Sequence, residues 1–296
     1  MLRLIRIFLF VLLAAFGAAN SIAASDAESR LREIRHDSAS LGREMPVRVL
    51  LPDGYENGSV RFPVLILLHG LGGDYRNWVD KTELTAKSQG LGLIIVMPDG
   101  GNSWYTDSAT QPKDAYESYL IKDLIPYIDS NFLTVPRKSS RMIAGLSMGG
   151  FGALKFALKH PTLFSVAGSF SGALDAPLRD ADNPFLRPSI EKVFGRSDDP
   201  RRKTDEIFSL VEKIIDQEVK ELPFLYLDCG SEDWLIGTNR DFSQRLLSKK
   251  IPHEFRQLPG RHDWRFWNAQ VDQFLRILVE RGVVSRIVQS KESKGV

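Results

Sequence analysis

The chain has 296 residues, of which 43% are hydrophobic and 26% are charged, a composition typical of a globular protein with a substantial core. Lysine and arginine total 39 against 37 acidic residues, and this near balance argues against a surface that binds nucleic acid or an anionic membrane. The length fits one large α/β domain or two small ones.

The first 23 residues predict a cleaved export signal. Arg3 and Arg6 form a short basic region, residues 7–19 are apolar, and residues 21–23 offer the small side chains that a signal peptidase reads. The apolar run is shorter than the roughly 18–20 residues that a membrane-spanning helix needs. We therefore expect a periplasmic or secreted protein without stable membrane insertion, rather than an uncleaved anchor.

Removing the export signal changes the charge balance. Without its two arginines, 37 basic residues face 37 acidic ones, and the mature protein is about neutral. Cys229 is the only cysteine, which excludes an intramolecular disulfide. Its neighbours look like a strand end, so we expect a small buried side chain.

Apolar runs alternate with amphipathic stretches along the rest of the chain. Strands are predicted at residues 30–36, 45–51, 62–68, 91–97, 142–146, 164–170, 223–228 and 253–258. Helices are predicted at residues 114–131, 151–158 and 264–281. Strands that alternate with helices favour an α/β fold, in which a mostly parallel sheet of about eight strands has helices on both faces. We expect residues 24–296 to form one such domain.

Residues 176–205 interrupt this alternation. The segment is polar and carries prolines at positions 177, 184, 188 and 200. It is predicted to be an insertion over the carboxyl ends of the strands, where ligands bind in such sheets. A lid or pocket wall is the functional interpretation, and an irregular surface loop is the alternative. The tail at residues 285–296 is polar and expected to fray.

Gly145, Ser147 and Gly149 form a G-x-S-x-G pattern between a predicted strand and a predicted helix. Strand, sharp turn and helix together are the context of a nucleophile elbow. A serine on such a turn needs neighbours without Cβ atoms, and the helix N-terminus favours developing negative charge. We predict Ser147 to be a nucleophile; a glycine-rich packing turn is the alternative.

A serine hydroxyl needs a base within hydrogen-bond reach. His262 lies on a loop that leaves the carboxyl end of the last predicted strand, whereas His36, His160 and His253 lie away from such loops. His69 follows a strand but precedes Ser147, and the glycines after it suit the oxyanion loop described below. His262 is therefore the predicted base, with a structural histidine as the alternative.

The base in turn needs a carboxylate, and the loop after residues 223–228 offers three. Asp228 ends the strand itself and is expected to bond to local backbone. Asp233 lies past Gly230, where the chain has turned over the sheet edge, and is the predicted acid; Glu232 is the fallback.

Two backbone N–H groups are predicted to stabilise the tetrahedral oxyanion, each worth about 3–4 kcal/mol. One is that of Met148, after the nucleophile, and the other is that of Leu71 in the glycine-rich loop 69–73. An ordinary tight turn is the alternative for that loop. The sequence has no cysteine–histidine cluster with zinc spacing and no nucleotide-binding fingerprint. We expect neither a metal nor another cofactor.

Taken together, five motifs resemble the esterase D family. They are residues 69–73 followed by Trp78, residues 98–105, Tyr116 to Tyr127, residues 145–150 and residues 260–264. This family includes S-formylglutathione hydrolases, feruloyl and acetyl-xylan-type esterases, and mycolyltransferases. The resemblance runs from about residue 30 to 282 and implies an α/β-hydrolase fold without a metal cofactor. It also implies the roles given above to Ser147, Asp233 and His262, whose order in the chain is that of α/β-hydrolases.

These observations predict an exported serine carboxylesterase that acts on small-molecule esters, such as acylated sugars or aromatic-acid esters, through an acyl-enzyme. The alternatives are an acyltransferase with a sugar or other alcohol acceptor, a peptidase, and a non-catalytic binding protein. Five aromatic side chains are candidates for an acyl or sugar pocket, with core packing as the alternative: Trp78, Trp104, Tyr105, Trp264 and Trp267.

Overall fold

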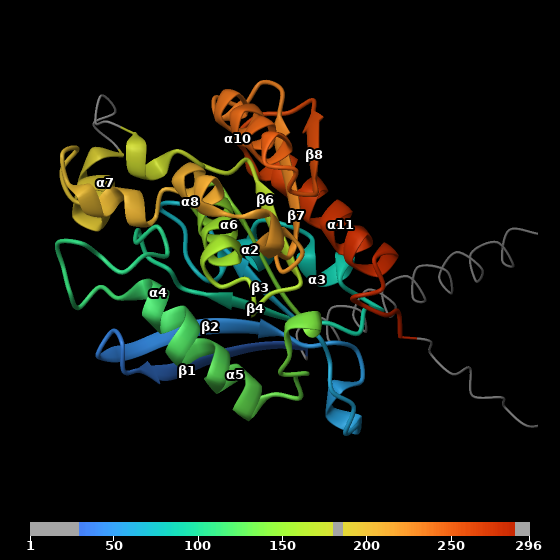
Figure 1. Cartoon of the computed structure of the whole chain (residues 1–296). Helices are drawn as coiled ribbons and strands as arrows, with labels where there is room; N and C mark the ends of the chain where they lie inside the picture. Colours follow the sequence, from blue (N-terminus) through green and yellow to red (C-terminus); the bar gives the residue numbers. More distant parts are fainter. Residues whose placement is uncertain (1–29, 180–185, 288–296) are drawn as a thin grey trace, which may run out of the picture.

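An eight-stranded sheet runs through the centre of the computed structural model, which describes residues 30–179 and 186–287 (Figure 1). The strand order is β1-β2-β4-β3-β5-β6-β7-β8. The strands are β1 (Leu31–Ser38), β2 (Arg43–Leu50), β3 (Val64–Leu68), β4 (Ile94–Pro98), β5 (Arg141–Leu146), β6 (Val166–Phe170), β7 (Phe224–Gly230) and β8 (His253–Leu258). β2 pairs antiparallel with β1 and with β4, and all other pairs are parallel. The predicted α/β class and mostly parallel sheet are confirmed.

The central strands are apolar because both of their faces are covered. Every residue of β3, β4, β5 and β6 is buried, which explains why these strands read as continuous apolar runs. β1, at the sheet edge, instead has several partly exposed and exposed residues.

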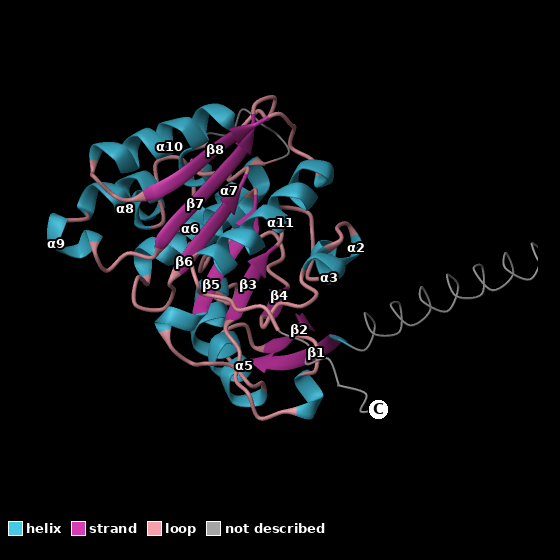
Figure 2. Cartoon of the chain, turned by 90° about the vertical axis from the view of Figure 1, so that its right-hand side faces the viewer, coloured by secondary structure: helices cyan, strands magenta, loops and turns pink. Residues whose placement is uncertain are grey.

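Helices lie against both faces of this sheet (Figure 2). They are α2 (Asn77–Asp80), α3 (Leu84–Lys87), α4 (Tyr116–Ser118), α5 (Ile125–Asn131), α6 (Met148–Lys159), α7 (Arg187–Phe194), α8 (Ile207–Lys213), α9 (Asp216–Val219), α10 (Ile236–Ser248) and α11 (Trp264–Glu280). One apolar cluster joins the sheet to α5, α6, α8 and α10. A second cluster joins the opposite face to α2, α3 and α11. Cys229 packs in the first cluster as a small buried side chain, as expected.

The helix predicted at residues 114–131 forms three consecutive stretches, two α-helical and one π-helical. α4 passes into a π-helical stretch (Tyr119–Leu124), which then continues as α5. Pro126 stands in the first turn of α5. It has no N–H to donate to the preceding turn, and this break in the ordinary helix ladder accompanies the irregular winding.

The segment 176–205 contains short helices rather than only irregular loop. They are the 3₁₀ turns Ala176–Leu178 and Pro200–Thr204 and the helix α7. Arg202 is buried among them and donates hydrogen bonds to the carbonyls of Pro177 and Gly195. Residues 180–185 lie outside the described part, so the interpretation as a lid stays a prediction.

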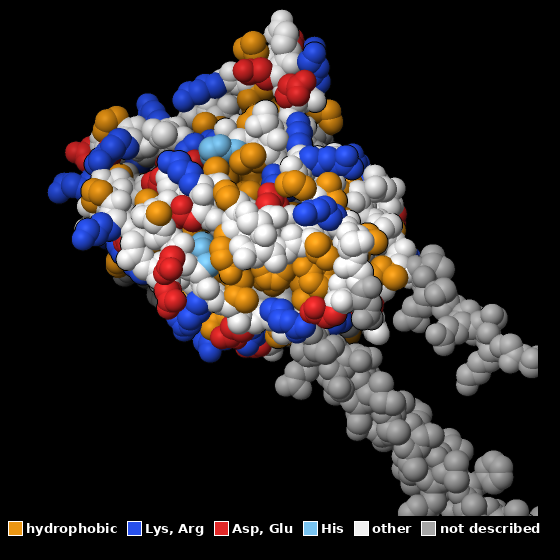
Figure 3. Space-filling model, turned by 90° about the horizontal axis from the view of Figure 1, so that it is seen from below, with side chains coloured by type: hydrophobic (Ala, Val, Ile, Leu, Met, Phe, Trp, Pro, Cys, Tyr) orange, Lys and Arg blue, Asp and Glu red, His pale blue; other side chains and the backbone are white. Residues whose placement is uncertain are grey.

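The predicted export segment and residues 288–296 of the predicted frayed tail lie outside the described residues. The prediction was wrong for residues 285–287, which are held in place: the Gly92 N–H donates to the Ser285 carbonyl at 2.9 Å, and the Ile287 N–H donates to the Gly90 carbonyl at 2.8 Å. Among the helices of residues 30–179 and 186–287, none has the length and apolarity needed to cross a bilayer. On the face shown in Figure 3, basic and acidic side chains are interspersed rather than gathered by sign, in line with the balanced composition.

Phe274 of α11 packs on the sheet in the second apolar cluster. Its ring lies 5.5 Å from that of Phe170 and 5.6 Å from that of Tyr226. It also fills the space over Gly168, where an added Cβ would come within 2.7 Å of the ring. The lack of a side chain at Gly168 therefore lets α11 approach the sheet closely.

We expect Phe274→Ala to lower the free energy of unfolding by about 3–5 kcal/mol, because it leaves a cavity in a fully buried cluster. Urea denaturation measures the change. Leu247→Ala, at an exposed position of α10, is the matched control and should change it by less than about 0.5 kcal/mol. Equal effects of the two substitutions would contradict this description of the core.

Candidate active site

Ser147 lies on a sharp turn between β5 and α6. Its backbone has φ 53° and ψ −113°, which is unusual and strained for a residue with a side chain. A Cβ on Gly145 would lie 2.6 Å from the carbonyl group of Gly149, and a Cβ on Gly149 would lie 2.6 Å from the carbonyl oxygen of Leu68. The turn can close only because both positions are glycine, and it holds the serine at the start of α6.

The structure brings together the three side chains that were predicted to act with one another. His262 Nε2 lies 3.0 Å from Ser147 Oγ, and His262 Nδ1 lies 2.9 Å from Asp233 Oδ2. Each residue follows a parallel strand, β5, β7 or β8, so all three reach the same edge of the sheet. With a carboxylate at Nδ1, the neutral ring carries its proton there, and Nε2 is free to accept the serine proton.

Asp233 is only 2% exposed and remains an anion. Burial raises the pKa of Asp233, but the His262 hydrogen bond and charge and the Leu235 N–H outweigh it, so the pKa lies below its ordinary value. The Leu235 N–H donates to Oδ1 over 2.9 Å. Glu232, the fallback acid, instead forms an exposed ion pair with Arg261 at 2.9 Å.

The expectation for Asp228 was wrong. This side chain is fully buried, and neither carboxyl oxygen has a hydrogen-bond partner among the described residues. Burial raises the pKa of Asp228 well above its ordinary value, and the nearby Tyr226 and Arg256 oppose this only in part. Burial thus favours the uncharged form of this carboxyl group. Strand alternation places it with Tyr226 on the face opposite Leu227 and Cys229.

The other four histidines make contacts elsewhere in the fold. His36 stacks on Tyr127, His69 accepts from the Gly100 N–H, His160 bonds to Glu117, and His253 bonds to Ser243. None of these four contacts involves Ser147, which leaves His262 as the histidine at the serine.

The predicted oxyanion donors are available in the described structure. Neither the Leu71 N–H nor the Met148 N–H donates a hydrogen bond to another described group. The loop that carries Leu71 is fixed just beyond it, because the Gly72 N–H donates to Asn102 Oδ1 over 2.8 Å. Leu71 lines the same cavity as Ser147 and His262. The roles of both N–H groups stay predictions.

Two cavities meet at the loop of Leu71 and Gly72. The smaller, of about 180 Å³, contains Ser147 and His262 together with Trp264 and Trp267. The larger cavity has a volume of about 450 Å³. At one end it is lined by Asp114 and by Arg43 and Lys192, which both pair with that carboxylate. Helix α7 supplies Ser189, Lys192 and other residues to its wall.

Three of the aromatic residues proposed for the pocket belong to the core instead. Trp78, Trp104 and Tyr105 are each 1% exposed, and none of them lines either of the two cavities described above. Their polar atoms donate hydrogen bonds inside the protein, to the Leu68 carbonyl, the Ser189 hydroxyl and the His69 carbonyl respectively. Such side chains fill apolar space with their rings and bond a buried polar group with their one polar atom.

Trp234 is an aromatic residue that the sequence argument did not single out. It is 55% exposed, and its ring lies 5.4 Å from the His262 ring. The Arg179 guanidinium lies 4.8 Å from the same indole ring. The only signal in the sequence was its place directly after Asp233. Within residues 30–179 and 186–287, no three histidine, cysteine or acidic side chains are arranged to hold a metal ion.

A family described as putative esterase matches residues 38–278 of this chain. Esterase Rv1288 of Mycobacterium tuberculosis (strain ATCC 25618 / H37Rv) is 34% identical over 267 residues, which cover 80% of this chain and 57% of that protein. The chain thus spans little more than half of that relative. An acetyl esterase of Caldicellulosiruptor saccharolyticus is 30% identical over 220 residues, covering 72% of this chain and 82% of that protein.

Solved structures show the same architecture. The fluorophosphonate-binding serine hydrolase FphF of Staphylococcus aureus has a TM-score of 0.75 and 27% identity, covering 84% of this chain and 98% of that chain. Among the relatives found by sequence, the diacylglycerol acyltransferase/mycolyltransferase Ag85A of Mycobacterium leprae is 32% identical over 177 residues, or 56% of this chain and 51% of that protein.

We expect Asp233→Asn to lower kcat for an ester substrate by about 10⁴-fold, because an amide cannot hold the histidine tautomer or stabilise its cation. Steady-state kinetics measures the loss. Glu232→Gln, one residue earlier and exposed, is the control and should leave kcat within about twofold. A larger loss in Glu232→Gln than in Asp233→Asn would reverse the assignment of the acid.

Proposed function

The chain belongs to this esterase family, as its motifs predicted, and we propose that it is an exported serine carboxylesterase acting through Ser147, His262 and Asp233. The observation that carries the proposal is the continuous hydrogen-bonded line from the Ser147 hydroxyl through the His262 ring to the buried Asp233 carboxylate. This line is the arrangement that converts an unreactive hydroxyl into a nucleophile.

The reaction has two halves. Ser147 Oγ attacks the ester carbonyl carbon while His262 Nε2 takes the hydroxyl proton, and Asp233 stabilises the resulting imidazolium. The negative oxygen of the tetrahedral intermediate is stabilised by the N–H groups of Leu71 and Met148. The intermediate then breaks its bond to the alcohol oxygen, which receives the proton from Nε2. Water attacks the acyl-enzyme in the same way and releases the acid.

The substrate proposed is an ester with a small or flat acyl group. The cavity beside Ser147 holds only about 180 Å³, less than the roughly 300–1,000 Å³ of sites that enclose drug-sized ligands. Trp264 and Trp267 supply apolar walls to this space. The similarity to an acetyl esterase supports a small acyl group.

Export is proposed from the sequence of residues 1–23, which lie outside the described structure. The basic start, apolar run and small residues at positions 21–23 support it. The N-terminal sequence of the protein recovered from outside the cytoplasm tests this proposal. A start at residue 24 is expected, and an unprocessed, cell-retained protein would contradict it.

Acyl transfer is the second candidate, and the similarity to mycolyltransferase Ag85A favours it. The same acyl-enzyme serves both reactions, which differ in whether water or an alcohol attacks it. Adding a sugar acceptor and measuring the ratio of transferred to hydrolysed product separates them. Hydrolysis that exceeds transfer at every acceptor concentration supports the esterase.

We expect Ser147→Ala to lower turnover of p-nitrophenyl acetate by about 10⁴-fold or more, because no other hydroxyl of residues 30–179 and 186–287 hydrogen-bonds to His262 Nε2. Absorbance of the released nitrophenolate measures the rate. Ser231→Ala, at an exposed position near the same sheet edge, should behave as wild type. Full turnover by the Ser147→Ala protein would refute the proposed function.

A further inference from the structure

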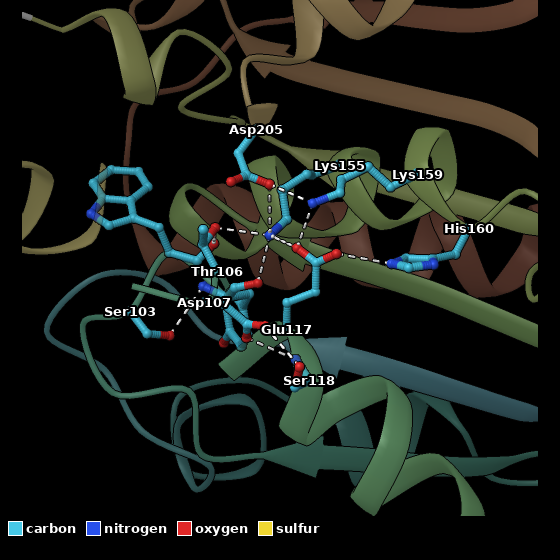
Figure 4. A network of polar contacts seen from close by, with 11 residues as sticks. Ser103, Thr106, Asp107, Glu117, Ser118, Lys155, Lys159, His160 and Asp205 are labelled. Carbon is cyan, nitrogen blue, oxygen red and sulfur yellow. Dashed lines mark hydrogen bonds and ion pairs between the residues drawn. The ribbon is translucent and has the colours of Figure 1, made fainter. Parts of the chain in front are cut away.

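A buried ammonium group lies on α6, the helix that begins at the nucleophile elbow. Lys155 of α6 is 0% exposed, and its Nζ donates to the Tyr105 carbonyl at 2.8 Å, Thr106 Oγ1 at 2.8 Å and Glu117 Oε2 at 2.7 Å. Three acceptors satisfy the three N–H bonds of an ammonium. Figure 4 shows this side chain pointing from α6 toward the segment that carries Thr106 and toward Glu117.

The charge of Lys155 is balanced by a small network. Glu117 also accepts from Lys159 Nζ and faces His160 Nε2, each at 2.9 Å, and Lys159 donates to Asp205 at 2.7 Å (Figure 4). Burial raises the pKa of Glu117, but the charges of Lys155 and Lys159 and the His160 hydrogen bond outweigh it and hold the pKa far below its ordinary value. An apolar side chain would fill such a space without a desolvation cost. Stability alone therefore does not explain a lysine here.

The ammonium fixes the backbone of Tyr105 in an unusual conformation. Trp104 and Tyr105 have φ values of 54° and 51°, which place two successive residues with side chains in the left-handed region. The Tyr105 ring fits between two glycines: a Cβ on Gly100 would overlap it, and a Cβ on Gly152 would lie 2.8 Å from it. Its hydroxyl donates to the His69 carbonyl at 3.0 Å.

This hydroxyl lies where the oxyanion loop meets the elbow. A Cβ on Gly149 would lie 2.7 Å from the His69 carbonyl oxygen, so that oxygen packs directly on the elbow. The Gly100 N–H donates to His69 Nε2 at 2.8 Å, and Asn102 holds the Gly72 N–H. The segment around Tyr105 therefore fixes the loop on both sides of Leu71, which carries a predicted oxyanion donor.

We infer that Tyr105, held by Lys155, is a positioning residue that sets the Leu71 N–H against the oxyanion formed at Ser147. The inference rests on the proposed function. Without the Tyr105 hydroxyl, the His69 carbonyl lacks its donor and the loop can turn. The Leu71 N–H is needed most in the transition state, when the oxyanion carries its charge. Misplacing this N–H therefore lowers kcat and leaves KM nearly unchanged.

The experiment compares Tyr105→Phe with Tyr119→Phe. Both tyrosines are 1% exposed, but the Tyr119 hydroxyl has no hydrogen-bond partner among the described residues. Each substitution removes one buried hydroxyl and keeps the ring. With p-nitrophenyl acetate, we expect Tyr105→Phe to lower kcat about tenfold or more with KM within twofold. Tyr119→Phe should leave both constants within twofold.

A second readout separates positioning from a merely structural role. Phenylboronic acid forms a tetrahedral adduct with a reactive serine, and its Ki should rise in Tyr105→Phe by about the factor by which kcat falls. If Tyr105→Phe does not fold, the double variant Lys155→Met/Glu117→Gln replaces it, because it removes one positive and one negative charge together. It should show the same fall in kcat with KM nearly unchanged. Circular dichroism reports folding of each variant.

Wild-type kcat or an unchanged Ki in Tyr105→Phe would overturn the inference, as would equal losses in Tyr119→Phe. These outcomes are distinct from failure of the proposed function. An active wild type and an inactive Ser147→Ala protein, together with an unaffected Tyr105→Phe, would overturn the positioning role alone. An inactive wild type or an active Ser147→Ala protein would overturn the proposed function itself.

Discussion

The close backbone contact between Gly145 and Gly149 is the constraint on which the site depends. It lets β5 pass into α6 through a single residue, Ser147, held at positive φ. That turn projects the hydroxyl at the carboxyl edge of the sheet and leaves the Met148 N–H, at the start of the helix, without an acceptor among the described residues. A larger side chain at either glycine would open the turn and displace the serine from the histidine.

Parallel strands turn this local feature into a site. β7 and β8 run alongside β5 and β6 in register, so the loops after them end at the same edge. Asp233 and His262 therefore meet Ser147 although they are distant in sequence. The buried charge network under α6 fixes the segment of Tyr105 against the oxyanion loop. The strained elbow and its neighbouring loop are supported from the protein interior.

Much of this arrangement could be predicted from sequence, because apolar runs that stop at glycine clusters mark where the strands end. The eight strands and the positions of Ser147 and His262 followed from such signals. Side-chain direction did not: spacing could not decide between pocket and core for Trp78, Trp104 and Tyr105. It also gave no sign that Asp228 is buried with no hydrogen-bond partner among the described residues. Helix α10 was missed because its buried stripe is narrow and half polar, with Asn239 and Ser243 beside Phe242 and Leu246.

Covalent labelling tests the central claim most directly. Wild-type protein is treated with a fluorophosphonate, digested and mapped by mass spectrometry. The account predicts one phosphonylated peptide, modified at Ser147, and much slower labelling in His262→Ala because the hydroxyl then lacks its base. Modification at another residue with Ser147 unlabelled, or an unchanged labelling rate in His262→Ala, would contradict it.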